Sequence, residues 1–197
     1  MGKITGVKGT TRKDVITQAA ARLFREKGFQ ATGMRDVAAR VGIEAASLYN
    51  HIKSKSELLQ EICFRIANEF TTQLNEIELN EQLNSLEKLE KVMRFQIRMW
   101  IDRVDEVIVT NNESKYLEEP YLTTFFNERK IYVRRLEQII EEGIRKNLIR
   151  KVQPYGIVLN LLSAVRGIEF WHRTKKHISA KDLEETMIEH LILGLKK

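Results

Sequence analysis

"GIEAASLYNHIKSK", residues 42–55, is the stretch of sequence that decides the fold. Its glycine can take a left-handed backbone conformation that other residues resist, which predicts a tight turn at Arg40–Ile43. Small and acidic residues follow the turn, and then come a tyrosine, an asparagine, a histidine and two lysines. The pattern predicts a short helix from about Glu44 to His51, with small side chains on its first turn and hydrogen-bonding groups on its second.

The residues on either side of this stretch predict further helices. Thr11 and Asp14 have the spacing of a capping box before an apolar series at helical intervals. A basic last turn followed by Gly28 is typical of a helix end. Thr32 is expected to cap a short second helix, and a second capping box, which begins at Ser54, is expected to open a long fourth helix.

The remainder of the chain is helical in pattern as well. Apolar residues recur every three or four positions, and there is no alternating strand pattern, internal repeat or low-complexity tract. The sequence therefore predicts an all-α fold, in which a three-helix N-terminal domain is joined to a larger C-terminal helical domain. The long helices of that domain are expected over residues 84–104, 120–146, 154–173 and 179–195, with Pro120 at the first helical position of the second.

Two short helices joined by a glycine-containing turn form a helix-turn-helix, whose second helix enters the major groove of DNA. Val37, Ala38 and Leu48 are among the apolar residues that fix the angle between the two helices. The short side chains of residues 45–47 let the second helix approach the bases closely. Residues 49–51 carry polar tips that reach phosphates or base edges.

The distribution of charge agrees with a polyanion-binding N-terminal segment. The chain has a formal net charge of +6. Residues 1–55 hold eleven basic and four acidic residues, a net charge of +7, and the other 142 residues are close to neutral. Lys53 and Lys55 stand at the start of the next helix, where free backbone N–H groups also favour a phosphate. Charge alone, however, would favour a solvated basic surface.

The segment "ATGMRDVAARVGIEAASLYNHIKSKSEL", residues 31–58, resembles the DNA-binding signature of the TetR family of bacterial transcriptional regulators. The resemblance covers residues 11–60 and implies a helix-turn-helix domain over residues 1–53. The rest of the chain, residues 54–197, would then bind a small molecule and dimerise. Two departures from the family pattern, Glu44 and Ala46, make the operator sequence hard to deduce.

The resemblance also implies a role for individual residues of this segment. Carried over position by position, the expected phosphate contacts are Thr32, Arg35, Tyr49, His51 and Lys55. The positions expected to face bases are Ala45, Ala46, Ser47 and Asn50. A structural role remains open for two of them, because Tyr49 can serve packing and His51 can serve as a local cap.

The C-terminal half is similar, more weakly, to the regulatory domains of TetR members that sense acyl-CoA thioesters. The segment "ESKYLEEPYLTTFFNERKIYVRRLEQIIEEGIRKNLIR", residues 113–150, and the helix ending at Trp171-His172-Arg173 carry this likeness. An acyl chain needs an apolar tunnel, and a coenzyme needs cations for its phosphates. The residues expected to bind the ligand are Phe95, Met99, Trp100, Phe126, Arg166 and Phe170. Arg94, Arg98, Arg103, Arg129 and Arg134 are further candidate cations.

Simpler explanations of the same residues remain open. Aromatic side chains at helical spacing also form plain core, and arginines on a helix also form a solvated face. Arg166 and Glu169 have the i, i+3 spacing of an ion pair within one helix.

Other classes of function have little support in the sequence. There is no glycine-rich phosphate loop, nucleophile motif or zinc-type cluster, so we expect neither an enzyme nor a metal site, and no cofactor. No run approaches the ~20 apolar residues that span a bilayer, and no apolar signal-peptide core follows the first residues. The one cysteine, Cys63, cannot form an internal disulfide. We therefore expect a cytoplasmic protein with no membrane partner.

The sequence thus predicts a ligand-responsive transcriptional regulator that binds a palindromic DNA operator. We expect a homodimeric repressor that is released by a small apolar effector, with an acyl-CoA as the first candidate. The apolar stripes expected to form the dimer are Ile157, Leu161, Val165 and Ile168, together with Leu183, Met187 and Leu191. The alternative is an architectural DNA-binding protein with no ligand response, which would need only the first 55 residues.

Overall fold

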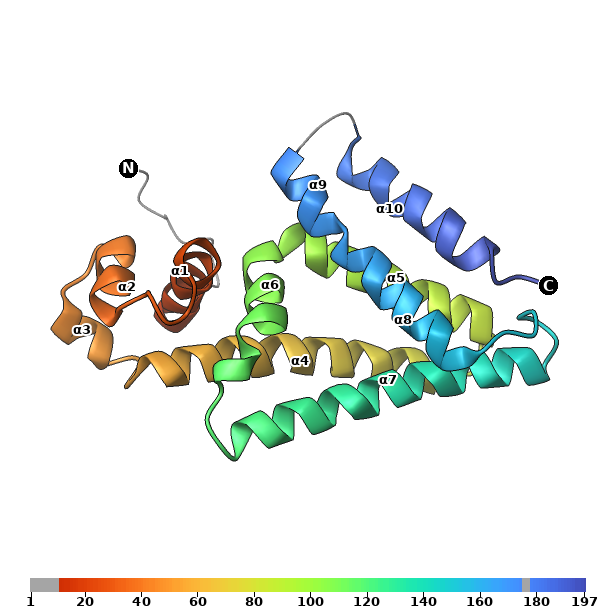
Figure 1. The fold of residues 1–197 in the computed structure, drawn as a ribbon, viewed down its shortest axis with the longest axis horizontal. Coiled ribbons are helices and arrows are strands. Elements are labelled where there is room, and N and C mark those ends of the chain that lie inside the picture. Colours follow the sequence, from red (N-terminus) through yellow and green to blue (C-terminus); the bar gives the residue numbers. More distant parts are fainter. Residues whose placement is uncertain (1–10, 175–177) are drawn as a thin grey trace. The chain divides into compact units, whose positions relative to one another are not determined.

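A computed structural model describes residues 11–174 and 178–197 of the chain (Figure 1). These residues fold into helices, and the described part contains no strand beyond a single bridge between Ile149 and Lys196. The predicted all-α fold is confirmed. The elements are α1 (Arg12–Lys27), α2 (Met34–Val41), α3 (Ala45–Tyr49), α4 (Lys55–Leu79), α5 (Ser85–Asp102), α6 (Val104–Asn112), the 3-10 helix η1 (Ser114–Tyr116), α7 (Tyr121–Arg145), α8 (Pro154–Arg166), α9 (Ile168–Thr174), α10 (Ala180–Ile188) and the π-helix η2 (Glu189–Leu193).

The chain divides into two compact units. The first comprises the residues up to Ala67 together with Asp105–Phe126, and the second comprises Asn68–Val104 together with Asn127–Lys197. Helices α4 and α7 each begin in the first unit and end in the second. The first unit therefore includes α6 and η1 as well as the helices before residue 53. The functional division at residue 53 stays a prediction.

Local signals explain the helix ends of the first unit. At the start of α1, the Thr11 hydroxyl accepts from the Asp14 backbone N–H and the Asp14 carboxylate accepts from the Thr11 N–H, which completes the predicted capping box. The predicted tight turn is also present, because Gly42 has φ +78° and donates to the carbonyls of Ala38 and Ala39.

One cap was predicted wrongly. Gly33, and not Thr32, is the N-cap of α2, and the Asp36 carboxylate accepts from the Gly33 N–H. The Thr32 side chain is buried instead, and its hydroxyl donates to the carbonyl of Gly28 at 2.8 Å.

The first unit has one apolar core that its helices share. Fully buried side chains from α1, α2, α3, α4, α6 and α7 meet in it, and the partly buried Tyr116 of η1 packs against it. Members of this core include Phe24, Val37, Leu48, Leu58, Ile62, Val109 and Phe125. The core fixes α2 and α3 against α1 and α4, and these helices carry the candidate DNA-binding residues.

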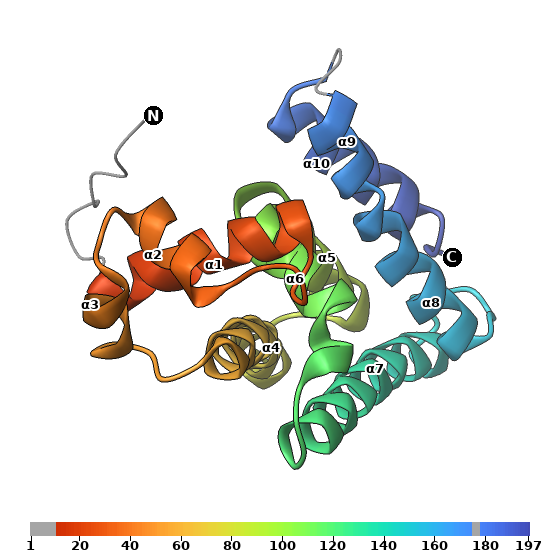
Figure 2. The same cartoon turned by 60° about the vertical axis from the view of Figure 1, so that its left-hand side comes forward.

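In the second unit, α5 packs against α8, α9 and α10 (Figures 1 and 2). The sequence predicted one helix over 84–104 and one over 154–173. The structure ends α5 at Asp102 and starts α6 at Val104, and it separates α8 from α9 at Gly167. Helix α6 was not predicted. Only Arg103 separates its first residue, Val104, from the end of α5 at Asp102.

Candidate DNA-binding and ligand-binding sites

The recognition helix α3 is anchored by a single fully buried side chain. Leu48 is 0% exposed, and its carbonyl accepts from the backbone N–H groups of His51 and Ile52. Around this anchor, the polar residues Ser47, Asn50 and His51 lie on the exposed surface. The helix is therefore fixed on its inner side and presents hydrogen-bonding groups on its outer side.

The small residues of α3 differ from one another in exposure. Ala46 is exposed, as a base-facing position requires, whereas Ala45 is partly buried and packs against the core of the first unit. Tyr49 is 52% exposed, and Leu48 provides the packing at this point of the helix. DNA contacts by these residues stay a prediction, and the structure gives Ala45 a packing role as well.

Thr32 and Lys55 are engaged within the chain. Thr32 is 1% exposed, and its hydroxyl is used within the chain, where it donates to the Gly28 carbonyl. The Lys55 ammonium donates to the carbonyls of Phe29 and Gln30, at 2.9 and 3.1 Å, and lies 4.5 Å from the centroid of the Phe29 ring. These contacts hold the turn between α1 and α2, and we therefore assign both residues a structural role.

Ion pairs within the first unit use much of its positive charge. Arg22 and Arg25 pair with Asp105, Arg40 pairs with Glu26, Lys27 pairs with Asp36, and Lys13 pairs with Glu61. Lys3 and Lys8 lie outside the described residues. Of the basic residues that the structure describes before α4, Arg12, Arg35 and Lys53 are in no ion pair with another described residue.

Two of these residues lie in the helix-turn-helix or directly after it. Arg35 is exposed in the first turn of α2, and Lys53 is exposed in the segment that leads into α4. They are the cations best placed to bind phosphates. The resemblance indicated Arg35 and Lys55 for this role. Lys53 stood in the same charged cluster, but the sequence could not show which of the two lysines is engaged within the chain.

The carboxylates paired with these bases are stabilised in their ionised form. The Gly33 backbone N–H and then the Lys27 ammonium lower the pKa of Asp36. A hydrogen bond from Arg40 lowers the pKa of Glu26 and outweighs the opposing effect of partial burial. The same pair raises the pKa of the Arg40 guanidinium. Both carboxylates are therefore ionised at neutral pH.

The structure does not bring all six predicted ligand-binding residues together. Met99 and Trp100 are buried and Phe95 is partly buried, and all three belong to α5 in the second unit. Phe126 belongs to the first unit and is 41% exposed. Arg166 and Phe170 lie on the exposed surface of α8 and α9, where Phe170 is 70% exposed. Glu169 pairs with Arg173, one turn further along α9.

A buried polar pair lies beside the aromatic residues of α5. The Gln96 amide donates to the Tyr132 hydroxyl at 2.8 Å, and Gln96 is only 5% exposed. Burial raises the pKa of the Tyr132 phenol to about 12. The Phe70 ring contacts both Phe95 and Tyr132, with centroids 5.8 and 6.2 Å apart. The sequence contained a signal for this pair, because Gln96 interrupts the apolar face of its helix.

The arginines proposed to bind coenzyme phosphates form ion pairs within the second unit. Arg94 and Arg98 of α5 both bind Glu184 of α10. Burial alone would raise the pKa of Glu184, but the hydrogen bonds from these arginines lower it on balance. Arg103 pairs with Glu69, and Arg134 pairs with Glu137 and Glu141. Arg94 and Arg98 thus link α5 to α10, whereas the pairs of Arg134 lie within α7 itself.

The apolar stripes predicted for the dimer are also divided between core and surface. Leu161, Val165 and Ile168 are buried within their own chain, because they pack in the core of the second unit. Other residues of the same helices remain exposed. Tyr155 and Leu159 are 48% and 47% exposed. With Phe170, Ile178 and Leu193 they form the exposed apolar residues of α8, α9, η2 and the segment before α10.

Two further features concern metal ions and membranes. Among the described residues, no group of three or more His, Cys, Asp or Glu side chains is arranged to hold a metal ion. No helix of the described chain is long and apolar enough to cross a membrane.

Two family models match the chain over most of its length. The model described as "Bacterial regulatory proteins, tetR family" matches residues 16–62, which include the helix-turn-helix. The model described as "Tetracyclin repressor-like, C-terminal domain" matches residues 82–195. The chain belongs to the tetR family. This confirms the resemblance drawn from residues 31–58.

Individual tetR-family relatives agree with this result. The chain is 24% identical over 197 residues to the HTH-type transcriptional repressor KstR2 of Mycolicibacterium smegmatis, covering 99% of this chain and 96% of the relative. It superposes on the KstR2 structure of Mycobacterium tuberculosis with a TM-score of 0.86, at 20% identity, covering 98% and 97% of the two chains. The AibR structure, solved with isovaleryl coenzyme A and operator DNA, matches with a TM-score of 0.78 at 28% identity, covering 92% and 98%.

Proposed function

We propose that this tetR-family chain is a transcriptional repressor that binds a palindromic operator and is released from it by a small apolar effector. The observation that carries the proposal is the arrangement of α3. Leu48 is fully buried under the helix, while Ser47 and Asn50 are exposed above it. Rigid support of exposed hydrogen-bonding groups is what readout of base edges requires.

The DNA contacts follow from exposure and charge. Ser47, Asn50 and Ala46 face the bases, and Tyr49 and His51 reach the backbone beside them. Arg35 and Lys53 bind phosphates on the two sides of the recognition helix. Their charges are available for this because neither residue is in an ion pair within the described chain.

The active form is a homodimer, because one recognition helix reads too few bases for useful specificity. Two copies related by a two-fold axis then bind half-sites about 34–36 Å apart or a multiple of that distance. The exposed apolar residues of α8 and α9, Tyr155, Leu159 and Phe170, supply the contact. Covering exposed apolar side chains of this size with a second copy removes them from water and stabilises the dimer.

An acyl-CoA is the first candidate effector. Support comes from the likeness of residues 113–150 to acyl-CoA-responsive regulators and from the AibR relative, whose structure holds isovaleryl coenzyme A. Within this chain, the buried Gln96–Tyr132 pair beside Phe70 and Phe95 combines apolar walls with an orienting polar group. That combination is the usual form of a small-molecule site.

Selection from a random duplex library with the full-length protein tests the DNA-binding half of the proposal. The expected result is an enriched palindrome whose half-sites are one or more helical turns apart. Enrichment of no sequence at all, despite tight binding at low salt, contradicts specific operator recognition.

The effector is tested on the complex with that palindrome. Thioesters of several chain lengths are titrated into the preformed complex, with free coenzyme A as the control. Release by one chain-length class, with a change in operator affinity of roughly 5–150-fold, is expected. If no acyl-CoA changes the operator affinity, the acyl-CoA assignment is wrong. If a broad metabolite screen also fails, constitutive DNA binding, the alternative from the sequence, becomes the better account.

A further inference from the structure

The turn between α1 and α2 is held by residues far from it in sequence. The Glu113 carboxylate accepts a hydrogen bond from the Phe29 backbone N–H at 3.2 Å. The Tyr116 ring stacks on the Phe29 ring, with centroids 5.6 Å apart and an interplanar angle of 21°. Lys55 binds the carbonyls of the same turn. The position of α2, which follows this turn, therefore depends on the residues just after α6.

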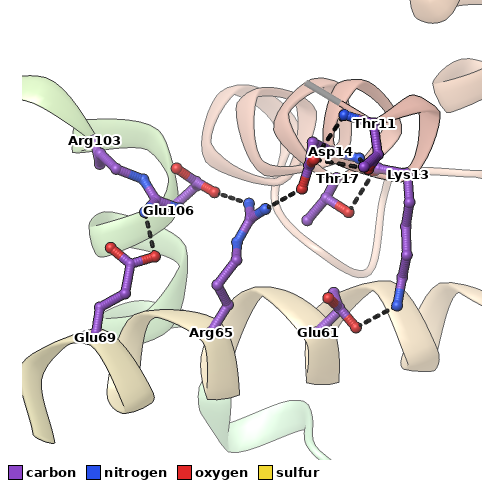
Figure 3. Close-up of polar contacts among 9 residues, drawn as sticks. All are labelled: Thr11, Lys13, Asp14, Thr17, Glu61, Arg65, Glu69, Arg103 and Glu106. Carbon is purple, nitrogen blue, oxygen red and sulfur yellow. Dashed lines mark hydrogen bonds and ion pairs between the residues drawn. The ribbon is translucent and has the colours of Figure 1, made fainter. Parts of the chain in front are cut away.

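The other end of α6 is bound to α1. Asp105 pairs with Arg22 and Arg25 of α1, at 3.4 and 2.7 Å. Arg65 of α4 connects the two helices, because one guanidinium nitrogen binds Asp14 of α1 at 3.1 Å and another binds Glu106 of α6 (Figure 3). In this view the guanidinium lies between the two carboxylates.

This bridge is partly buried and therefore rigid. Glu106 is 5% exposed, and the Arg65 side chain is 21% exposed. A planar guanidinium can bind two carboxylates at once, which an ammonium group cannot do with the same geometry. Asp14 also caps α1 through Thr11, so the bridge holds the first turn of that helix.

We propose that residues 105–116 set the position of the helix-turn-helix, and that Glu113 and Arg65 are positioning residues for operator binding. This inference rests on the proposed function. The chain re-enters the first unit at Asp105, and the Asp105 carboxylate itself pairs with Arg25 of α1. The contacts of Asp105, Arg65 and Glu113 thus fix α1 and the turn before α2 from within the first unit. Neither Glu113 nor Arg65 needs to touch DNA for this.

The direction in which one substitution changes operator affinity distinguishes this positioning role from simple electrostatic repulsion. Removing an acidic residue from a DNA-binding protein ordinarily tightens binding, because repulsion from phosphates decreases. Glu113→Ala is expected to do the opposite and to weaken operator binding about three- to tenfold, since an unsupported turn makes α2 and α3 less well placed. The salt slope is expected to stay unchanged, because no phosphate contact is lost. Glu113→Gln keeps an acceptor for the Phe29 N–H and is expected to bind like the wild type.

Amide exchange in the free protein provides a measurement that does not depend on DNA. The Phe29 amide is expected to exchange about tenfold faster in Glu113→Ala than in the wild type or in Glu113→Gln, since its hydrogen bond is lost. Glu76→Ala is the matched control, because Glu76 is an exposed acidic residue of α4 in the second unit. It is expected to leave both Phe29 exchange and operator affinity as they are.

The outcomes are distinguishable from a failure of the proposed function. If Phe29 exchange is unchanged in Glu113→Ala, or if Glu113→Gln behaves like Glu113→Ala, the inference is wrong whatever the DNA results. If exchange accelerates while operator binding is unchanged or tighter, the positioning role is wrong but the operator function stands. Arg65→Lys is the second variant, should Glu113→Ala fail to fold. It is expected to speed exchange in the first turn of α1 and to weaken operator binding with an unchanged salt slope, and unchanged exchange there overturns the inference.

Discussion

The ammonium group of Lys55 donates a 2.9 Å hydrogen bond to the carbonyl of Phe29 and lies 4.5 Å from the centroid of its ring. One side chain thus combines a charge-assisted hydrogen bond with a cation–π contact, and both stabilise the turn before α2. Two residues away, the exposed Lys53 is in no ion pair with another described residue. The two lysines are close in sequence, but the structure places them in different environments.

Alanine substitution of the two lysines is expected to have different effects. Lys53→Ala should weaken binding to all duplex sequences alike and lower the salt slope by about one unit, because one phosphate contact is lost. Lys55→Ala should lower the free energy of unfolding by about 1–2 kcal/mol, because the carbonyls of the turn lose a charged donor. Denaturant titration and DNA binding at several salt concentrations measure both. The assignment fails if Lys55→Ala changes the salt slope and leaves stability intact.

Base-facing residues should act on operator preference. Ser47→Ala and Asn50→Ala are each expected to cost roughly 1–3 kcal/mol on the preferred operator for a lost base contact, and less on operators changed at the contacted position. Competition binding against a panel of single-base operator variants measures this. A uniform loss across the whole panel would instead assign the residue to the backbone.

Substitution of Gly42 tests how much the turn of the helix-turn-helix depends on a left-handed backbone conformation. Its φ of +78° lies in the left-handed region, so Gly42→Ala is expected to destabilise the protein by about 1–2 kcal/mol. A Cβ there would meet no atom within 4 Å, so the cost comes from backbone strain and not from crowding. Gly42→Asn, which tolerates this conformation better, is the control and should lose less. Equal losses for the two variants would contradict the strain explanation.

The sequence predicted those parts of the structure that depend on neighbouring residues. The capping box of Thr11 and Asp14 and the turn at Gly42 are of this kind, because each is made by residues a few positions apart. Lys55 and Glu113 show the limit. Their partner, the turn at Phe29, is 26 and 84 residues away, and no local pattern encodes such a pairing.

Helical spacing also left the environment of the apolar residues undetermined. It assigned Val165 to a dimer stripe and Phe170 to the ligand site, but it did not show which of these side chains the chain covers by itself. In the structure, Val165 is 1% exposed and Phe170 is 70% exposed. The difference depends on which helices pack together, and the same gap in information explains why the predicted ligand residues are not all brought together.

Acid should destabilise the first unit. Hydrogen bonds from the Thr11 side chain and backbone lower the pKa of Asp14, and the Gly33 N–H lowers that of Asp36. A carboxyl with a depressed folded-state pKa adds stability above its unfolded pKa, near 4, and this stability is lost as the pH falls through the folded-state pKa. The free energy of unfolding should therefore fall from about pH 4 downward. Urea titrations between about pH 2 and 6 measure this fall.

Asp14→Asn provides the control for the acid effect. It cannot ionise, so its free energy of unfolding should depend less steeply on pH in the acid range than that of the wild type. At neutral pH the variant should be less stable, because Arg65 loses a charged partner. An unchanged acid slope in Asp14→Asn would show that the pH dependence arises from other groups.

The last prediction concerns the Gln96–Tyr132 pair, in which each buried polar group provides the hydrogen-bond partner of the other. Tyr132→Phe removes the acceptor of the buried Gln96 amide and is expected to cost about 1–3 kcal/mol of unfolding free energy. Gln96→Leu alone leaves the hydroxyl without its donor and should also destabilise. The double variant replaces both groups by apolar ones and should lose less than the sum of the two single losses, with a coupling of about 0.5–3 kcal/mol. Denaturant titration of the four proteins gives this coupling, and strictly additive losses would contradict the pairing. The double variant should keep operator binding, because Ser47 and Asn50 are untouched, but it should lose release by the effector if this pair orients the effector as we propose.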